Sequence, residues 1–199
     1  MHWIVSHWIE IFGTVTGLLY IYLSIKEKAS LWIVGFLTSA AYIYVFYKAK
    51  FYADMSLQVY YLFISVYGLY YWLKGGKVKT DGNKEQVPIR KTDLKLWGIL
   101  VVVFAILFVV MGFVLDDYTD SPVPWWDSFT TAASIIATWM LARKLIEQWL
   151  IWIVVDLVSM GLYIVKGLYP TSFLFLVYTI LAIVGYFQWR KTMMQYAYA

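Results

Sequence analysis

The sequence predicts an all-α integral membrane protein, in which seven transmembrane helices form two parallel three-helix repeats joined by one linker helix. Three observations predict this fold class: the composition, the spacing of the apolar runs and an internal repeat. Of 199 residues, 62% are hydrophobic and 14% are charged, whereas a soluble domain has about 25% charged residues. A bilayer core about 30 Å thick needs about 20 apolar residues per helix, so the chain has room for about seven spans.

Apolar runs between charged residues mark the individual spans. The run Ile99–Val110 does not alternate apolar with polar residues, so helices are expected and barrel strands are not. The predicted spans are Trp8–Ile25, Leu31–Tyr47, Met55–Leu73, Leu94–Leu115, Trp125–Leu141, Trp149–Val165 and Thr171–Trp189.

The basic residues predict the orientation in the membrane. All of the sixteen Lys and Arg residues except Lys48, Lys50 and Lys166 fall on one side of the seven spans. Because cytoplasmic loops carry the excess of positive charge, the N-terminus is expected outside and the C-terminus in the cytoplasm. The polar stretch Gly75–Lys91 is expected to be the main cytoplasmic loop.

The N-terminus has no signal-peptide pattern, so the first span is expected to stay in the protein. The charges form no single patch, so nucleic acid is not an expected partner.

An internal repeat organises the spans. Sliding the chain by 117 residues without a gap aligns three whole spans with three others, together with their ends. The matched pairs include Trp8 with Trp125, Trp32 with Trp149, Tyr52 with Tyr169, Tyr61 with Tyr178, Gly68 with Gly185 and Trp72 with Trp189. We therefore expect a first three-helix repeat over 1–74, a cytoplasmic loop plus linker helix over 75–123, and a second repeat over 124–199. One extra crossing intervenes, so the repeats are parallel. Transporters built from repeats bind solute near the midplane, which directs attention to polar residues within spans.

The strongest local pattern is Trp149-x-x-Trp152-x-x-x-Asp156 in the sixth span. Spacings of three and four residues place these side chains on one helical face. A carboxylate at membrane depth costs about 3 kcal/mol, so it usually faces a cavity, a partner or a cation. Indole rings attract a cation by about 2 kcal/mol when water is excluded, so the pattern suits an aromatic cation. In the alternative reading, Asp156 is neutral or paired with Lys166, and Trp149 is an interfacial anchor.

Two further candidates lie in the third span. Gln58 and Tyr61 share a helical face with Asp54, and the Gln58 amide could orient a hydroxyl or an amide of a solute. The alternative for Gln58 is a hydrogen bond between helices, and Asp54 is expected to be solvated. In the first span, Gly13-x-x-x-Gly17 is a close-packing motif.

Several kinds of chemistry have no residues to support them. The chain has no cysteine, and its two histidines, His2 and His7, lie outside the predicted spans. A phosphate-binding Gly-rich loop with Lys-Ser/Thr is absent from the sequence. We therefore expect no enzyme activity, catalytic residue, metal site or cofactor.

These motifs together resemble the PnuC family of vitamin transporters, over nearly the whole chain except the linker and the fourth span. The resemblance implies a SWEET-like 3+1+3 fold, a homotrimer, and a multi-pass protein of the bacterial cytoplasmic (inner) membrane. It also implies uptake of nicotinamide riboside by facilitated diffusion, with a cytoplasmic vitamin kinase trapping the product. The residues that carry the resemblance are Gly13-Thr14-x-Thr16-Gly17, Tyr52-Ala53-Asp54-x-x-Leu57-Gln58-x-x-Tyr61, Trp149-x-x-Trp152-x-x-x-Asp156, Ser159, Gly161-Leu162-Tyr163 and Lys166-Gly167-Leu168-Tyr169.

One departure from the family pattern affects the substrate. Many nicotinamide riboside carriers of the family have Asn at the position of Asp156, and other relatives are associated with thiamine or riboflavin. Nicotinamide riboside and thiamine are both aromatic cations, whereas riboflavin is neutral and fits Asp156 less well. We expect nicotinamide riboside first and thiamine second. A proton-coupled symporter using Asp156 and a non-transporting membrane subunit are the other hypotheses.

Overall fold

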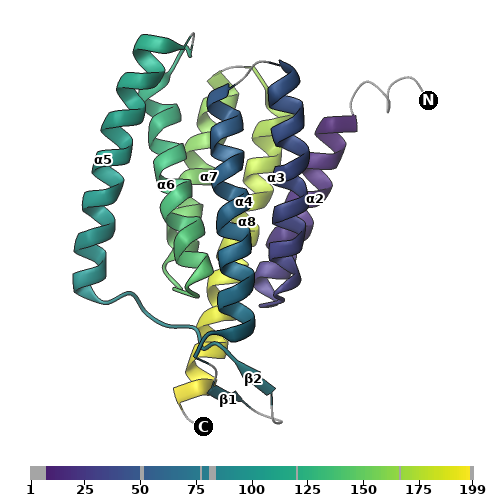
Figure 1. Cartoon of the computed structure of the whole chain (residues 1–199), viewed down its shortest axis with the longest axis vertical. Coiled ribbons are helices and arrows are strands. Elements are labelled where there is room, and N and C mark those ends of the chain that lie inside the picture. Colours follow the sequence, from purple (N-terminus) through teal and green to yellow (C-terminus); the bar gives the residue numbers. More distant parts are fainter. Residues whose placement is uncertain are drawn as a thin grey trace. The chain divides into compact units, whose positions relative to one another are not determined.

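The computed structural model describes residues 8–49, 52–76, 78–80, 84–119, 121–165 and 167–197. In these ranges the chain forms seven α-helices and one two-stranded hairpin (Figure 1). The seven predicted helices are confirmed, with ends that differ by a few residues. The elements are α2 (Trp8–Ile25), α3 (Ser30–Ala49), α4 (Tyr52–Lys74), β1 (Val78–Thr80), β2 (Lys84–Gln86), α5 (Leu94–Tyr118), α6 (Pro124–Ala142), α7 (Gln148–Val165) and α8 (Tyr169–Ala197).

Four of the helices in the described residues are long and apolar enough to cross a membrane: α3, α5, α7 and α8. Helix α2 holds a shorter apolar stretch, Ile11–Ile25. Helix α6 is rich in Ser and Thr, and its hydroxyls bond to carbonyls one turn earlier in the same helix: Thr131 to Asp127 at 2.7 Å and Thr138 to Ser134 at 2.8 Å. The Ser128 hydroxyl instead donates to the Phe108 carbonyl of α5, so α6 uses its hydroxyls both within the helix and toward its neighbour.

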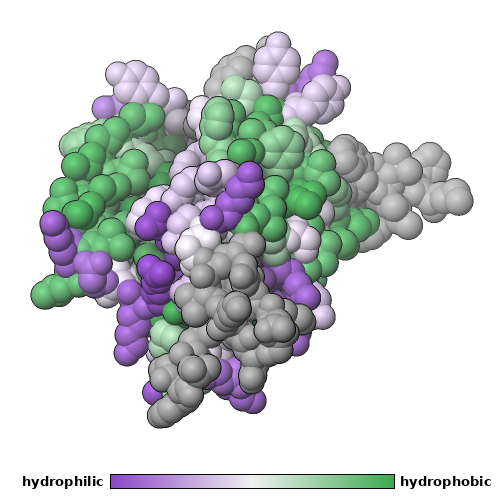
Figure 2. All heavy atoms as spheres, turned by 60° about the horizontal axis from the view of Figure 1, so that its bottom comes forward, coloured by the Kyte–Doolittle hydropathy of each residue, from purple (hydrophilic) through white to green (hydrophobic). Residues whose placement is uncertain are grey.

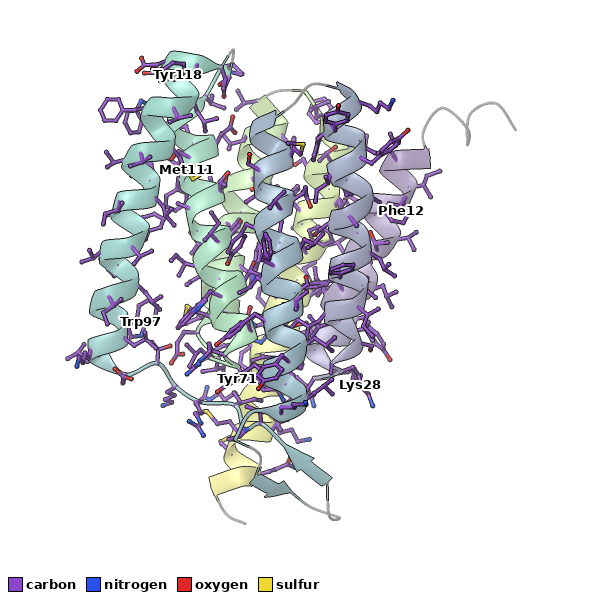
Figure 3. All side chains as sticks on the ribbon, viewed as in Figure 1. Phe12, Lys28, Tyr71, Trp97, Met111 and Tyr118 are labelled. Carbon is purple, nitrogen blue, oxygen red and sulfur yellow. The ribbon has the colours of Figure 1, made fainter. Side chains whose placement is uncertain are left out.

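Helix α5 is the most apolar helix and leaves one side uncovered. Val102, Ile106 and Val110 are each more than half exposed, and the left flank of Figure 2, which α5 forms, is largely hydrophobic. Figure 3 marks the two ends of α5 by Trp97 and Tyr118, which are residue types enriched at membrane interfaces. The uncovered side of α5 suits contact with lipid.

Contacts divide the chain into two compact units, Met1–Pro88 and Ile89–Tyr198. In the first unit, α3 packs against both α2 and α4. Trp32 of α3 lies on Gly68 of α4, where a Cβ would overlap the indole ring. Trp32 also meets Trp72 edge to face, with ring centroids 5.7 Å apart. In α2, Gly13 lies against the side chain of Tyr42 of α3, so close packing at Gly13 is confirmed.

In the second unit, α5, α6, α7 and α8 pack in chain order. A core of Leu100, Ile136, Met140 and Leu145 joins α5, α6 and the turn that follows α6. Where α7 meets α8, Trp149 lies on Gly185 and a Cβ there would lie 2.6 Å from the ring. Trp149 also meets Trp189 edge to face, with centroids 5.6 Å apart.

The turns before α3 and α7 have the same backbone conformation. Glu27 has φ 52° and Lys144, 117 residues later, has φ 54°; they are the two non-glycine residues with positive φ among those described. In each turn the next amide closes a hydrogen bond of 2.9 Å, from Lys28 to the Leu23 carbonyl and from Leu145 to the Met140 carbonyl.

The polar stretch that ends the first unit is more ordered than the sequence suggested. It contains the antiparallel hairpin of β1 and β2, with Val78 opposite Gln86, whereas we expected only a loop. Arg90 then pairs with Leu145 as an isolated parallel bridge. Glu147 Oε2 accepts hydrogen bonds from the backbone N–H of Thr92 (3.0 Å) and from its hydroxyl (2.8 Å). The residues that follow the hairpin are thus attached to the α6–α7 turn.

Helix α8 is longer than predicted. It continues past Trp189 through Arg190 and Lys191 to Ala197. The apolar pattern ends at the first charged residues after Trp189. A helix satisfies its own backbone hydrogen bonds, so it can continue into water past the end of the apolar segment.

Candidate functional site

The candidate site lies on the buried face of α7. Trp149 and Asp156 are buried, and Trp152 is half-buried. An α-helix has 3.6 residues per turn, so the three positions fall within an arc of about 60°. The predicted common face is thus present in the structure, and it turns away from the exposed Leu150, Val154 and Leu157.

Asp156 is 5% exposed. Within the described part of the chain its carboxyl has no hydrogen bond and no ion pair. Lys166, the proposed alternative partner, lies outside the described residues. A buried carboxylate without a partner is unfavourable, so the site is short of a cation or a hydrogen-bond donor. Among the described residues no group of three His, Cys, Asp or Glu could hold a metal ion.

The two tryptophans of the motif differ in their surroundings. Trp149 is 3% exposed, fixed on Gly185 and against Trp189, and its indole N–H has no acceptor among the described residues. Its ring packs between α7 and α8, a contact that the sequence analysis did not foresee, and solute contact by Trp149 stays a prediction. Trp152 stacks on no described aromatic ring. Solute contact by Trp152 stays a prediction.

Gln58 and Tyr61 lie on α4, in the first unit. Both are half-buried, and the Tyr61 ring lies 5.5 Å from that of Tyr60 at 57°. The side chain of Asp54 lies outside the described residues. Helix α4 belongs to the first unit and α7 to the second, and solute contact by Gln58 and Tyr61 stays a prediction.

Two further polar residues lie on the same face of α7. Ser159, which the sequence analysis used only for the family resemblance, is 7% exposed, and Gln148, which it did not single out, is fully buried. The amide oxygen and nitrogen of Gln148 have no hydrogen-bond partner in the described residues. One signal was present in the sequence: the repeat aligns Gln148 with Leu31, so a polar residue stands where the first half has an apolar one.

A cavity of about 410 Å³ opens elsewhere in the second unit, beside the α6–α7 turn and the C-terminal part of α8. None of the predicted site residues lines it. The lining residues are Lys91, Ile146, Glu147, Tyr186, Arg190, Met193 and Met194.

Comparison with known proteins shows the family. The family described as "Nicotinamide mononucleotide transporter" matches residues 7–191. The nicotinamide riboside transporter PnuC of Escherichia coli K12 is 29% identical over 206 residues, covering 92% of this chain and 84% of that protein. The riboflavin/roseoflavin transporter RibM of Streptomyces davaonensis is 26% identical over 183 residues, with 92% and 84% covered.

A solved structure shows the same family similarity. The crystal structure of the vitamin B3 transporter PnuC has 25% sequence identity and a TM-score of 0.75, and the match covers 94% of this chain and 83% of that one. Its similarity extends over the helices described above. The resemblance to PnuC proteins is therefore confirmed, and the chain is a multi-pass membrane protein that belongs to the nicotinamide mononucleotide transporter family.

Proposed function

We propose that this protein takes up nicotinamide riboside across the bacterial inner membrane by facilitated diffusion. The observation that carries the proposal is the buried, unpartnered carboxyl of Asp156 on the same helical face as the free indole of Trp152. The nicotinamide ring of the riboside is a flat aromatic cation. It would offset the Asp156 charge while its face lies on Trp152, an attraction of about 2 kcal/mol when water is excluded.

Asp156 also separates the riboside from the other solutes named for this family. A mononucleotide carries a phosphate, and its negative charge would be repelled by a buried carboxylate. Riboflavin, which the Streptomyces relative is named for, is neutral and would leave Asp156 uncompensated. Thiamine is an aromatic cation and remains the second candidate.

We propose the 3+1+3 organisation for the same transporter, with parallel repeats over 1–74 and 124–199 and α5 as the linker helix. The matched packing of Trp32 on Gly68 and of Trp149 on Gly185 supports this organisation. The N-terminus then lies outside and the C-terminus in the cytoplasm, as the basic residues indicate. A homotrimer follows from the family resemblance.

Facilitated diffusion needs no ion or nucleotide at the transporter, since phosphorylation of the vitamin by a cytoplasmic kinase would keep its inward gradient. A proton-coupled cycle is the competing mechanism, because a membrane carboxylate such as Asp156 can carry a proton. Uptake into proteoliposomes with and without an imposed proton gradient separates the two: equal initial rates support facilitated diffusion, and a gradient-dependent rate overturns it.

Competitive binding to the purified protein tests the substrate. Nicotinamide riboside should bind more tightly than thiamine, and both should bind more tightly than nicotinamide mononucleotide or riboflavin. Asp156→Ala should weaken riboside binding about 30-fold, since losing a polar interaction with a charged group costs about 2 kcal/mol. Asp117→Ala, on the exposed end of α5, is the matched control. Unchanged affinity in Asp156→Ala would remove this residue from the site.

A further inference from the structure

Gln148 is buried at the first residue of α7, and fold stability alone does not account for its amide. Both polar atoms of the side chain are shielded and without partners in the described residues. Burying an amide without hydrogen bonds is unfavourable. An apolar side chain of similar size would avoid that cost, so the presence of an amide needs a reason.

The first half of the chain contains the matching apolar residue. Leu31, 117 residues earlier, is equally buried at 0% exposure. It is followed by Trp32 on Gly68, just as Gln148 is followed by Trp149 on Gly185. The preceding turns share their left-handed residue and their hydrogen bonds. The same local packing is therefore built with leucine in one unit and with glutamine in the other.

Gln148 also shares its helical face with the candidate site. Positions 148, 152 and 156 are spaced by four residues, and Ser159 returns to within about 20° of Gln148 around the helix. With a rise of 1.5 Å per residue, Gln148 lies about 12 Å along the axis from Asp156, toward the turn that carries Arg143 and Lys144. One buried face of α7 therefore carries polar groups from that end to the middle of the helix.

We propose that Gln148 is a solute contact at the cytoplasmic end of this α7 face, and that its amide hydrogen bonds with polar groups of the solute as it passes. This inference rests on the proposed transport function. The amide offers two donors and an acceptor, and the Trp149 indole N–H beside it offers a third unpartnered donor. Such a set suits hydroxyls or a carboxamide, groups that both donate and accept. The conformation described here has Gln148 closed to solvent, so contact with solute belongs to a conformation open to the cytoplasm.

The test replaces Gln148 by the residue that the first half already uses. Gln148→Leu should keep or raise the unfolding temperature in detergent, because it removes an unsatisfied amide and repeats the Leu31 packing. Its initial rate of nicotinamide riboside uptake into proteoliposomes should fall about tenfold, as expected for one or two lost hydrogen bonds. The reciprocal Leu31→Gln should lower the unfolding temperature and leave uptake per folded molecule unchanged.

Different results would overturn the proposed transport function and the proposed role of Gln148. If the wild-type chain carries no nicotinamide riboside, the proposed function fails. If the wild-type chain carries it and Gln148→Leu carries it equally fast, the role of Gln148 fails, and its amide serves only a buried water. Should Gln148→Leu not fold, Gln148→Met keeps the chain length without the amide and must show the same loss.

A labelling experiment gives an independent reading. The natural chain has no cysteine, so Gln148→Cys introduces the sole thiol. A membrane-permeant maleimide should label it in the intact protein, and nicotinamide riboside should slow the labelling. Leu31→Cys should show no protection by the solute. Equal labelling of Gln148→Cys with and without the riboside overturns the proposed contact.

Discussion

The turn into α3 and the turn into α7 have nearly the same packing and very different chemistry. Each has a left-handed residue, then a buried tryptophan that lies on a glycine of the next helix and meets a second tryptophan edge to face. Around this shared packing, the first half has Leu31, Gly35 and Ser39, whereas the second half has Gln148, Trp152 and Asp156 at the aligned positions. The comparison separates residues that hold helices together from residues that are candidates for solute binding.

The largest expected effect tests whether the two tryptophans are equivalent. Trp149→Ala and Trp32→Ala should each lower the stability by about 4 kcal/mol, because truncating a buried Trp leaves a cavity. Thermal unfolding in detergent measures both losses. Trp149→Phe, which keeps part of the ring, should lose less. If Trp149→Ala folded as stably as the wild type and lost only solute affinity, the packing role would be wrong and the original binding prediction for Trp149 would stand.

A smaller effect is expected at Trp152, which aligns with Gly35 of the first half. Trp152→Ala should weaken nicotinamide riboside binding by about 2 kcal/mol, close to 30-fold, since the desolvated cation–π contact is lost. Its stability should change far less than that of Trp149→Ala, because Trp152 is half-buried and stacks on no described ring. Calorimetry measures the affinity. A large stability loss with unchanged affinity would make Trp152 a second packing residue.

The hydrogen bonds from Thr92 to Glu147 attach the segment after β2 to the second half of the chain. Thr92→Val removes the 2.8 Å hydrogen bond to Glu147 while keeping the shape of the side chain. It should cost about 1 kcal/mol, at the lower end for a bond to a charged group, because Thr92 is only half-buried. Ser30→Ala, at the position that aligns with Glu147, should change the unfolding temperature little. Equal shifts for both variants would mean that the Thr92–Glu147 contact contributes nothing specific.

The sequence was sufficient for the helices and for the common face of the motif, because hydropathy and the 3.6-residue period are local properties. It was not sufficient for the different surroundings of Trp149 and Trp152. Both are tryptophans on one face, and only the position of Gly185 on a different helix shows that the first packs between two helices. The hairpin Val78–Gln86 was missed because its strands are three residues long and polar. Gln148 was missed because its significance is visible only when Leu31 is seen to be equally buried.

The smallest expected effect tests the shared turn itself. Glu27 and Lys144 hold left-handed backbone, which costs a residue with a Cβ about 1 kcal/mol more than glycine. Lys144 is 2% exposed whereas Glu27 is half-buried, so removing the two side chains has different consequences. Glu27→Gly should raise the stability slightly, and Lys144→Gly should not, because it also removes a buried side chain.

Alanine variants isolate the backbone contribution. Glu27→Ala and Lys144→Ala remove the same side chains but keep the Cβ. The difference in stability between Gly and Ala therefore reports the left-handed strain, less the extra unfolded-state entropy of glycine, which is about equal at both positions. That difference should favour glycine by about 1 kcal/mol at both positions. Thermal unfolding of the four variants measures it. Equal differences would mean that the two turns are under equal strain, and that the two halves of the chain diverge only in the side chains placed on that backbone; unequal differences would mean that the backbones had also diverged.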